Sequence, residues 1–432
     1  MEKVISFDPV FLSMGEDKCK IKPAEFFDIA AIQGFYGLES SGLKGKKDFV
    51  RKYWEDITIK LSVRGSIEKL LTKRDNIRVV DLGCGSGEGF ELLTHIPAIR
   101  PFIPGKQSFM LSSDQISYTG VDISGSMVQQ GKENYTNHKN VRFEQADLDK
   151  GFPLRDEQPF DIYFSSYSSL SHLTPYKLQI LVEEILNHAK PGAIIVFDLI
   201  GKYSLEWPKY WTENRTMLPY NMEYLTPPEL RGKETIQWWD ICFWTPAMLF
   251  QTLDAASKKM DTAIDVVQTF DRSIFLGRHM ETGLFGAPRL NYRYQVNQLF
   301  DYEHREEIEH LLINLDWCKE LEKIRPDVRG RLCDYKEKWN CIIHLVEALV
   351  HGNDSMVSSL IETTSQDISN ELKFLTWLYR NAHRFPAVDF WASIMGPQIA
   401  VILRNIELSF EPALGCGHGL LCVIEITESL DT

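Results

Sequence analysis

Short runs of apolar, largely β-branched residues alternate with amphipathic stretches between residues 77 and 200. The runs are apolar enough for strands covered on both faces, and they span 77–82, 118–123, 141–146, 160–166 and 193–199. The stretches between them predict helices over 86–95, 124–135 and 174–189. Alternating strands and helices predict a parallel sheet with right-handed crossovers, and therefore an α/β fold with helices on both faces.

The residues that flank this segment have a different pattern. Residues 24–74 place apolar side chains three and four positions apart, which predicts a helical lid or buttress. An aromatic-rich stretch follows the fifth predicted strand, and then come a helix opened by Thr245 and Pro246 and a strand over 264–270. Further amphipathic helices, rich in Leu, Ile and Glu, are predicted within 300–350 and 366–410.

The turn after the first predicted strand is rich in glycine. The segment VVDLGCGSGEG takes a buried strand through Asp81, Gly83, Gly85 and Gly87 into a helix. Glycines at alternate positions let the backbone turn tightly and approach a ligand, and the start of the helix offers free N–H groups. A dinucleotide-binding turn has a further glycine where this chain has Glu88, which argues against NAD. The alternative is a tight loop that binds no ligand.

This D-x-G-x-G-x-G turn resembles the first motif of class I S-adenosylmethionine-dependent methyltransferases, and the likeness extends over residues 77–200. The resemblance implies a Rossmann-like methyltransferase sheet that uses S-adenosylmethionine as its cofactor. It assigns the methionine part of the cofactor to the turn after the first strand, which contains Asp81, Gly83, Cys84, Gly85 and Gly87.

Acidic residues follow the second and third predicted strands. By the same resemblance, Asp122 in YTGVDISGSM binds the two ribose hydroxyls, because a carboxylate accepts both protons better than a neutral side chain does. Asp147 accepts from the adenine amine, while Leu148 and Ile123 flank the ring. Helix or turn capping at the surface is the alternative for both acids. The other members of the implied cofactor set are Met127 and Ser165.

Two segments compete for the last strand of the sheet. A class I sheet normally ends with two antiparallel strands, the last inserted between its neighbours, and 264–270 fits the first of them. The segment 273–279 follows at once but contains Gly277 and two charges, whereas 420–426 is a continuous apolar run before Glu425. We therefore expect the terminal segment to complete the sheet. The predicted division is a helical lid at 1–76, a methyltransferase core at 77–280, a helical accessory region inserted at 281–415, and a terminal strand at 416–432.

Residues near the methyl acceptor are predicted from the loops after the strands. His172 lies with Tyr167 on the loop after the fourth strand, where the carboxyl ends of parallel strands form the ligand crevice, so it is a candidate general base. Its alternative is a helix N-terminal residue bonded to a neighbouring loop. His279 is the second candidate base.

The same reasoning gives three candidate substrate contacts farther along the chain. Arg278 lies among glycines and charges, and an arginine there is suited to clamp a carboxylate or phosphate; a solvated hairpin edge is the alternative. Trp207 and Trp211 belong to the aromatic-rich stretch, which either walls an acceptor pocket or fills a hydrophobic core. The turn at Cys416–His418 has no second ligand pair in sequence, so we predict no metal.

Composition narrows the partners. The net charge of −13 argues against a broad nucleic-acid footprint, and no apolar stretch is long enough to cross a membrane without a charge. The eight cysteines contain no C-x-x-C pair and are interpreted as reduced thiols. We therefore predict a cytoplasmic protein with neither nucleic-acid nor membrane partners.

The preferred hypothesis is methyl transfer from S-adenosylmethionine to a small-molecule acceptor by in-line displacement. A protein- or RNA-directed methyltransferase is the first alternative, and the acidic balance disfavours the RNA version. A non-catalytic binding module is the second, disfavoured because Asp81, Asp122 and Asp147 are all present. The acceptor atom, O, N, C or S, and the oligomeric state stay open.

Overall fold

The computed structural model describes residues 19–37, 48–98, 109–227, 231, 236–303, 305 and 307–427. Its main sheet has seven strands in the order β4-β3-β2-β5-β6-β10-β9. The strands are β2 (Ile77–Leu82), β3 (Ile116–Asp122), β4 (Val141–Gln145), β5 (Ile162–Ser165), β6 (Ile194–Ile200), β9 (Ile264–Arg272) and β10 (Gly419–Ile426). The first five are mutually parallel, and β10 runs antiparallel to both β6 and β9.

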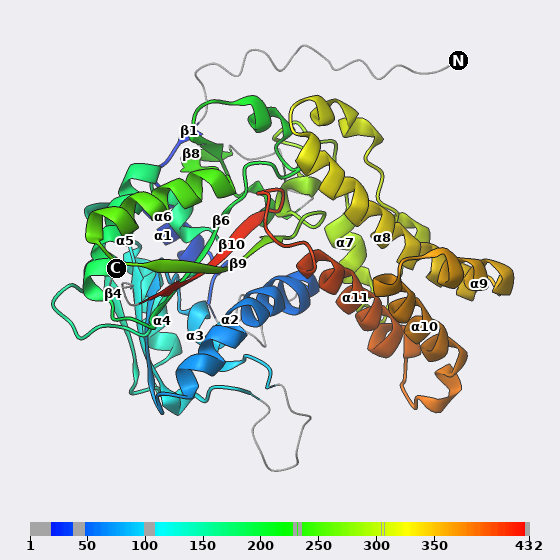
Figure 1. Ribbon diagram of the computed structural model, residues 1–432, viewed down its shortest axis with the longest axis horizontal. Helices are drawn as coiled ribbons and strands as arrows, with labels where there is room; N and C mark the ends of the chain where they lie inside the picture. Colours follow the sequence, from blue (N-terminus) through cyan, green and yellow to red (C-terminus); the bar gives the residue numbers. More distant parts are fainter. Residues whose placement is uncertain are drawn as a thin grey trace.

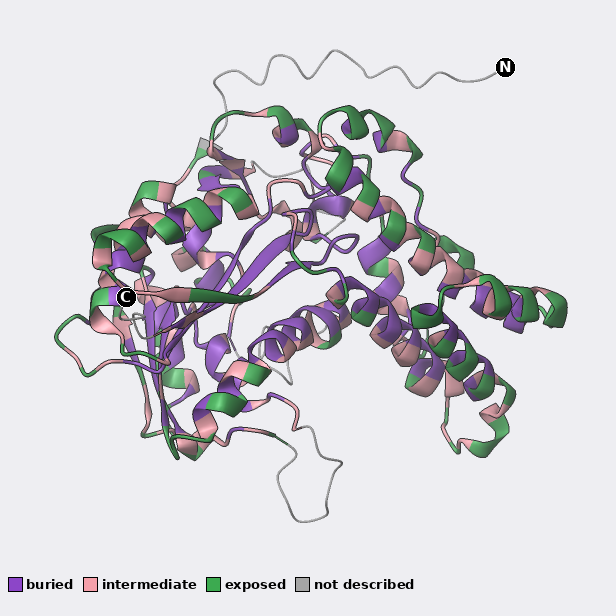
Figure 2. Cartoon of the chain, viewed as in Figure 1, coloured by how far each residue is buried: buried purple, intermediate pink, exposed green. Residues whose placement is uncertain are grey.

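Helices cover both faces of this sheet (Figure 1). α5 (Pro175–His188) and α6 (Pro246–Met260) pack on one face, while α2 (Asp56–Leu71), α3 (Glu88–Thr94) and α4 (Gly125–Asn134) pack on the other. Because side chains alternate along a strand, Val79 faces the second group and Val80 the first. Figure 2 shows the result: the strands are mostly buried, and the outer surfaces of the helices are exposed.

Local side chains start these helices as the sequence predicts. The hydroxyl of Ser124 accepts from the N–H of Met127 at the start of α4, and the hydroxyls of Thr174 and Thr245 cap α5 and α6 in the same way. Each of the last two helices also has proline in its first turn. Side chains next to the first turn in the sequence thus fix where α4, α5 and α6 begin.

The terminal segment completes the sheet, as predicted. β10 lies between β6 and β9, with Leu421 opposite Asp198 on one side and Phe270 on the other. The competing segment forms no strand: Ser273 has a left-handed backbone with φ of 59°, and a 3-10 turn, η8 (Arg278–Glu281), follows. The division of the chain at residues 76, 280 and 415 stays an interpretation.

The N-terminal region and the aromatic-rich stretch meet above the sheet. α1 (Pro23–Ile32) is followed by a π-helical turn, η2 (Arg51–Glu55), that leads into α2. The aromatic-rich stretch is more ordered than the sequence suggests, because β7 (Met217–Tyr220) and β8 (Gln237–Cys242) form a second, three-stranded sheet with β1 (Cys19–Lys20). This small sheet brings the N-terminal segment and the stretch together.

A helical region follows β9 and precedes β10 in the chain. It contains α7 (Tyr292–Gln298), α8 (Pro326–Val350), α9 (Asp354–Thr363), α10 (Gln366–Arg380), a π-helical turn η12 (Trp391–Met395) and α11 (Gly396–Leu408). The helix expected from residue 300 begins only at Pro326, after 3-10 turns η9 (Ile308–Leu311) and η10 (Asp316–Lys323). Its core continues through Val50, Trp54 and Ile274, so the region packs on η2 and on the chain after β9. No helix in the described residues is long and apolar enough to span a membrane.

Candidate active site

A cavity of about 440 Å³ lies at the carboxyl ends of the parallel strands. One half is lined by the loops after β2, β3, β4 and β5, and the other by the N-terminal segment, the second sheet and the ends of β9 and β10. Among the described residues, none between 281 and 415 lines it. The helical accessory region therefore does not form the cavity wall.

The glycine turn forms the floor of the first half. Gly83, Gly85 and Gly87 all have positive φ, at 77°, 54° and 98°. A Cβ on Gly83 would lie 2.4 Å from the Cβ of Ser169, so only glycine fits there. The N–H of Gly85 donates to Asp122 Oδ2 at 2.8 Å, which joins the turns after β2 and β3. The backbone thus approaches this side of the cavity as closely as a ligand-binding turn requires.

Most of the predicted cofactor residues line this half of the cavity. Asp122 also accepts from the N–H of Ser124 at 2.9 Å, and burial raises its pKa despite those hydrogen bonds. Asp147 accepts from the N–H of Asp149 at 3.0 Å. The predicted cofactor residues on the cavity wall are Gly83, Cys84, Gly85, Asp122, Ile123, Met127, Asp147 and Leu148.

Three predicted cofactor residues lie beneath the cavity instead. Asp81 is buried and accepts from the hydroxyl of Tyr118 at 2.5 Å, and burial raises the pKa of its carboxyl to about 7. Ser165 is buried and donates to the carbonyl of Leu82 at 2.8 Å. A Cβ on Gly87 would meet the rings of the core behind the turn. The side chains of Asp81 and Ser165 point into the sheet's packing layer and Gly87 lies against it, so these residues shape the turn from below.

Tyr167 stands at the centre of the second half of the cavity. Its backbone is left-handed, with φ of 52°, and its N–H donates to Asp198 at 2.9 Å. Its hydroxyl donates to Asp56, and the guanidinium carbons of three arginines lie over its ring. These are Arg51 at 4.0 Å, Arg272 at 5.1 Å and Arg278 at 5.6 Å from the ring centroid. Burial raises the pKa of Tyr167, so the ring stays a neutral phenol.

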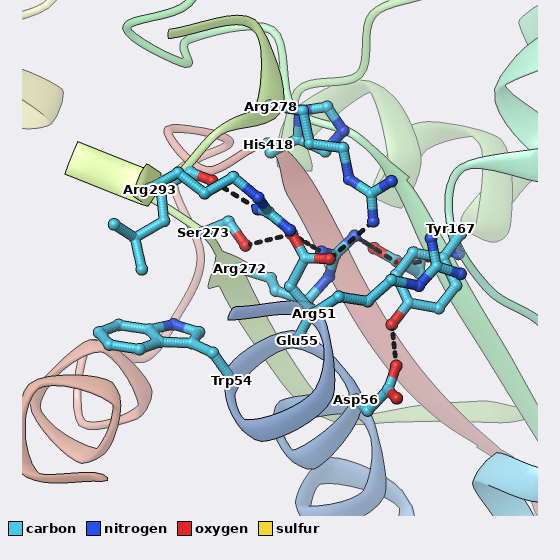
Figure 3. Close-up of polar contacts among 12 residues, drawn as sticks. Arg51, Trp54, Glu55, Asp56, Tyr167, Arg272, Ser273, Arg278, Arg293 and His418 are labelled. Atoms are coloured by element: carbon cyan, nitrogen blue, oxygen red, sulfur yellow. Dashed lines mark hydrogen bonds and ion pairs between the residues drawn. The ribbon is translucent and has the colours of Figure 1, made fainter. Parts of the chain in front are cut away.

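One buried carboxylate, that of Glu55, pairs with three arginines, which are Arg272, Arg278 and Arg293 (Figure 3). Its oxygens lie 3.3 Å from Arg272, 2.8 Å from Arg278 and 2.9 Å from Arg293. Arg272 also pairs with Asp198 at 2.9 Å. Burial alone raises the pKa of Glu55, but the three guanidinium charges outweigh it and hold that pKa well below its usual range.

The two predicted bases lie in different surroundings. His172 lines the cavity between the rings of Phe27 and Trp239, its Nδ1 has no hydrogen-bond partner in the described structure, and burial lowers its pKa to about 4. His279 lies outside the cavity wall: it is fully buried, and its ring nitrogens contact the carbonyl of Asn221 and the hydroxyl of Thr282 at 3.0 and 3.2 Å. With both nitrogens engaged, His279 has the geometry of a core histidine.

The aromatic residues that line the cavity are not the two tryptophans predicted from the sequence. Trp207 and Trp211 are buried and donate to the carbonyls of Gly201 and Ser204, so the hydrophobic-core alternative describes their place. The aromatic residues that line the second half instead are Phe27, Tyr36, Tyr220, Tyr224 and Trp239. The sequence marked the stretch as aromatic, but which rings turn inward depends on the second sheet.

Among the described residues, one group of side chains is arranged so that it could hold a metal ion. Glu309, Glu347 and His351 place one ligand atom each within 4.8 Å of one another, at the surface of the helical region. They do not line the cavity. Exposed acidic groups of this kind are common without an ion.

Comparison with known proteins gives one family and several solved structures. The family model of a methyltransferase domain matches residues 73–242. An S-adenosylmethionine-dependent methyltransferase from Clostridium acetobutylicum is 15% identical, with a TM-score of 0.32, over 50% of this chain and 83% of that one. An amino pentose methyltransferase from Micromonospora echinaspora, solved with S-adenosylmethionine, is 14% identical, with a TM-score of 0.32, over 49% and 86%. Comparison with curated protein sequences gives no match.

The domain match and the sheet agree with each other. Residues 73–242 cover β2 to β8, including the glycine turn and both acidic strand ends. The sheet adds the antiparallel pair, with the last strand of the chain between its neighbours. The match identifies residues 73–242 as a methyltransferase domain, so the chain is a methyltransferase.

Proposed function

We propose that this enzyme methylates a small molecule that binds in the second half of the cavity, beside Tyr167 and Arg278. The observation that carries the proposal is the continuity of the site: one cavity joins the glycine turn and Asp122 to the arginines and tyrosines of the other half. When bound, S-adenosylmethionine supplies an electrophilic methyl group. The protein's contribution is to align an acceptor with that group and to exclude water.

The donor set of the first half fits the cofactor. We assign the methionine part to the glycine turn, the ribose hydroxyls to Asp122, and the adenine to Asp147 between Ile123 and Leu148. Asp122 lies on the cavity wall, and so does Gly85, where the space around the backbone is open for a ligand. Asp81 then acts indirectly, since its carboxylate lies below the turn.

The walls of the second half favour a planar acceptor that carries an acidic group. Tyr167 and five further aromatic rings line it, and Arg278 reaches it from between the rings of Tyr167 and Tyr224. Among the described residues, the carboxylate paired with Arg278 is that of Glu55, which is shared with two further arginines, so Arg278 is left with N–H groups for a ligand. Lys22, Pro23 and Phe27 line the cavity from the N-terminal side. This enclosure favours a small molecule over a protein or RNA, and the free thiols among the described residues support a cytoplasmic location.

Cofactor binding is the first test. We expect S-adenosylhomocysteine to bind the wild-type protein in calorimetry, and Asp122→Ala to weaken binding by about 1.5 to 3 kcal/mol, the value of a hydrogen bond to a charged group. Asp122→Asn keeps the shape and is the second variant. Asp265→Ala, an exposed aspartate on β9, is the matched control. Equal affinity of the wild-type protein and both Asp122 variants would contradict the assignment of the ribose site.

Acceptor preference is the second test. Release of S-adenosylhomocysteine is measured with matched pairs such as 4-hydroxybenzoate and 4-hydroxybenzamide, and with peptide and RNA pools. We expect turnover with members of the acidic set, and Arg278→Gln to remove the preference for the acid over its amide. Turnover with peptides or RNA alone would contradict the small-molecule proposal.

A further inference from the structure

A histidine and a glutamate form a buried pair at the edge of the cavity. Nδ1 of His418 lies 2.8 Å from Oε1 of Glu206, and the two residues are 5% and 1% exposed. The His418 ring lines the cavity, whereas Glu206 does not. A carboxylate behind an imidazole whose other edge faces a ligand site is the arrangement that orients a general base in many enzymes.

Glu206 is held as a carboxylate. It accepts from the hydroxyl of Ser204 at 3.1 Å and from the N–H of His279 at 2.5 Å. Burial alone raises the pKa of Glu206, but His418 and His279 outweigh burial and keep that pKa below its usual value. An ionised Glu206 accepts the Nδ1 proton of His418, and the neutral ring then has its lone pair on Nε2.

The backbone fixes the direction of the His418 ring. The carboxylate of Asp271 accepts from the N–H groups of residues 414–417, which clamps the loop before β10. The carbonyl of His418 accepts from the N–H of Gly201 at 3.2 Å, at the end of β6. Trp207 packs behind the imidazole, with ring centroids 5.7 Å apart. A turn before a strand can form without a buried carboxylate, so the turn alone does not explain why Glu206 pairs with His418.

We propose that His418, positioned by Glu206, is the general base that removes the acceptor's proton, which makes the acceptor a hydroxyl or an amine; this rests on the proposed function. The acceptor's lone pair forms the new bond to the methyl carbon, and the carbon–sulfur bond breaks with its electron pair left on sulfur. The acceptor's proton passes to Nε2 of His418. Glu206 stabilises the resulting imidazolium, which returns the proton to solvent after product release.

His418 is better suited to this task than the two histidines predicted from the sequence. Nδ1 of His172 has no hydrogen-bond partner among the described residues, and burial lowers the pKa of His172 to about 4, so it is a weak base. His279 has both nitrogens engaged and lies outside the cavity wall. Glu206, after β6, pairs with His418, and Arg272 on β9 and Arg278 at the start of η8 line the same cavity as His418.

Chemical labelling tests the availability of Nε2 without any acceptor. Diethyl pyrocarbonate acylates unprotonated imidazole nitrogens, and peptide mass spectrometry reports the rate at each histidine. With S-adenosylhomocysteine bound, we expect His418 to react while His279, the internal control, does not. Glu206→Gln should slow labelling of His418 and leave that of exposed His383 unchanged. An unreactive His418, full protection by S-adenosylhomocysteine, or a rate insensitive to Glu206→Gln would overturn the proposal.

Turnover gives the second readout, with an acceptor from the panel described above. His418→Gln should lower kcat by about 10² to 10⁴. Glu206→Gln should give a smaller loss with a shifted pH profile, which a merely structural role would not produce. His383→Gln is the matched control. An unchanged kcat for His418→Gln would overturn the proposal, whereas failure of S-adenosylhomocysteine to bind would overturn the proposed function instead.

Discussion

Removing the charge of Glu55 is the most direct test of the buried cluster in Figure 3. Glu55→Gln keeps the size of the side chain but takes one negative charge from among three arginines. Arg293 retains Asp48 and Arg272 retains Asp198, but Arg278 loses its acidic partner. The substitution therefore leaves the buried guanidinium of Arg278 without a directly paired carboxylate among the described residues.

The cost follows from that burial. Glu55 is 0% exposed, and breaking a buried ion pair by removing one partner typically costs about 3 to 5 kcal/mol. The same substitution at Glu320, whose pair with Lys323 is at the surface, should have almost no effect because water screens exposed charges. Both variants replace a paired glutamate with glutamine, so the difference between their losses of stability reports the effect of burial.

Urea unfolding followed by tryptophan fluorescence measures the difference, since Trp54 adjoins Glu55 and donates to Glu407 at 2.8 Å. The folded-state pKa of Glu55 is depressed, so its stabilisation is complete above the unfolded pKa of about 4.3 and is lost as the pH falls towards the folded pKa. The gap between wild-type protein and Glu55→Gln should therefore be constant near neutral pH and shrink in acid. A Glu55→Gln midpoint equal to that of Glu320→Gln at pH 7 would refute the reasoning.

Three further predictions concern the sheet and its helices. Gly89→Ala should destabilise the protein and weaken binding of S-adenosylhomocysteine in calorimetry, because the new Cβ would lie 2.0 Å from Oδ2 of Asp81. In contrast, Gly65→Ala should raise stability by about 0.5 to 1 kcal/mol in urea unfolding, because Gly65 lies within α2 and has open space around it. Asp81→Asn should gain stability relative to wild type by about 1.4 kcal/mol per pH unit from about pH 4 to 7. Burial raises the folded pKa of Asp81 to about 7, so over this range the carboxyl ionises in the unfolded state but stays protonated in the folded state, which lowers the stability of the wild-type protein as the pH rises; a gap independent of pH would contradict this. Deleting residues 418–432 removes β10 from between β6 and β9 and should abolish cooperative unfolding, and a truncated protein that still unfolds cooperatively and binds S-adenosylhomocysteine would show that the sheet does not need β10.

The sequence predicts most of the residues that line the first half of the cavity, because that half is local. The glycine turn and Asp122 each follow directly from a strand, and parallel strands bring their carboxyl ends to one edge whatever the rest of the chain does. Asp81 is the instructive exception. The pleat turns its side chain into the packing layer, where it meets Tyr118, although its neighbours reach the cavity.

The second half is not predictable in the same way because it is assembled from distant segments. Arg51 belongs to the N-terminal region and Trp239 to the second sheet, and both reach the cavity only through tertiary packing. His418 shows the same limit. Its sequence context is a glycine-rich turn before a strand, and its partner Glu206 lies 212 residues away in the chain.

The helical region acts on the site from a distance. Glu407 on α11 accepts from the backbone of Ser273 and Ile274 and from the indole of Trp54, and Arg293 on α7 pairs with Glu55. These contacts hold η2 against the left-handed turn after β9, which are the two segments that carry Arg51, Arg272 and Arg278 to the cavity. Since the loops after β2, β3, β4 and β5 line the first half of the cavity, helices between β9 and β10 can set the positions of the arginines in the second half without disturbing the first. The place of these helices in the chain therefore fits a role in shaping the second half of the cavity.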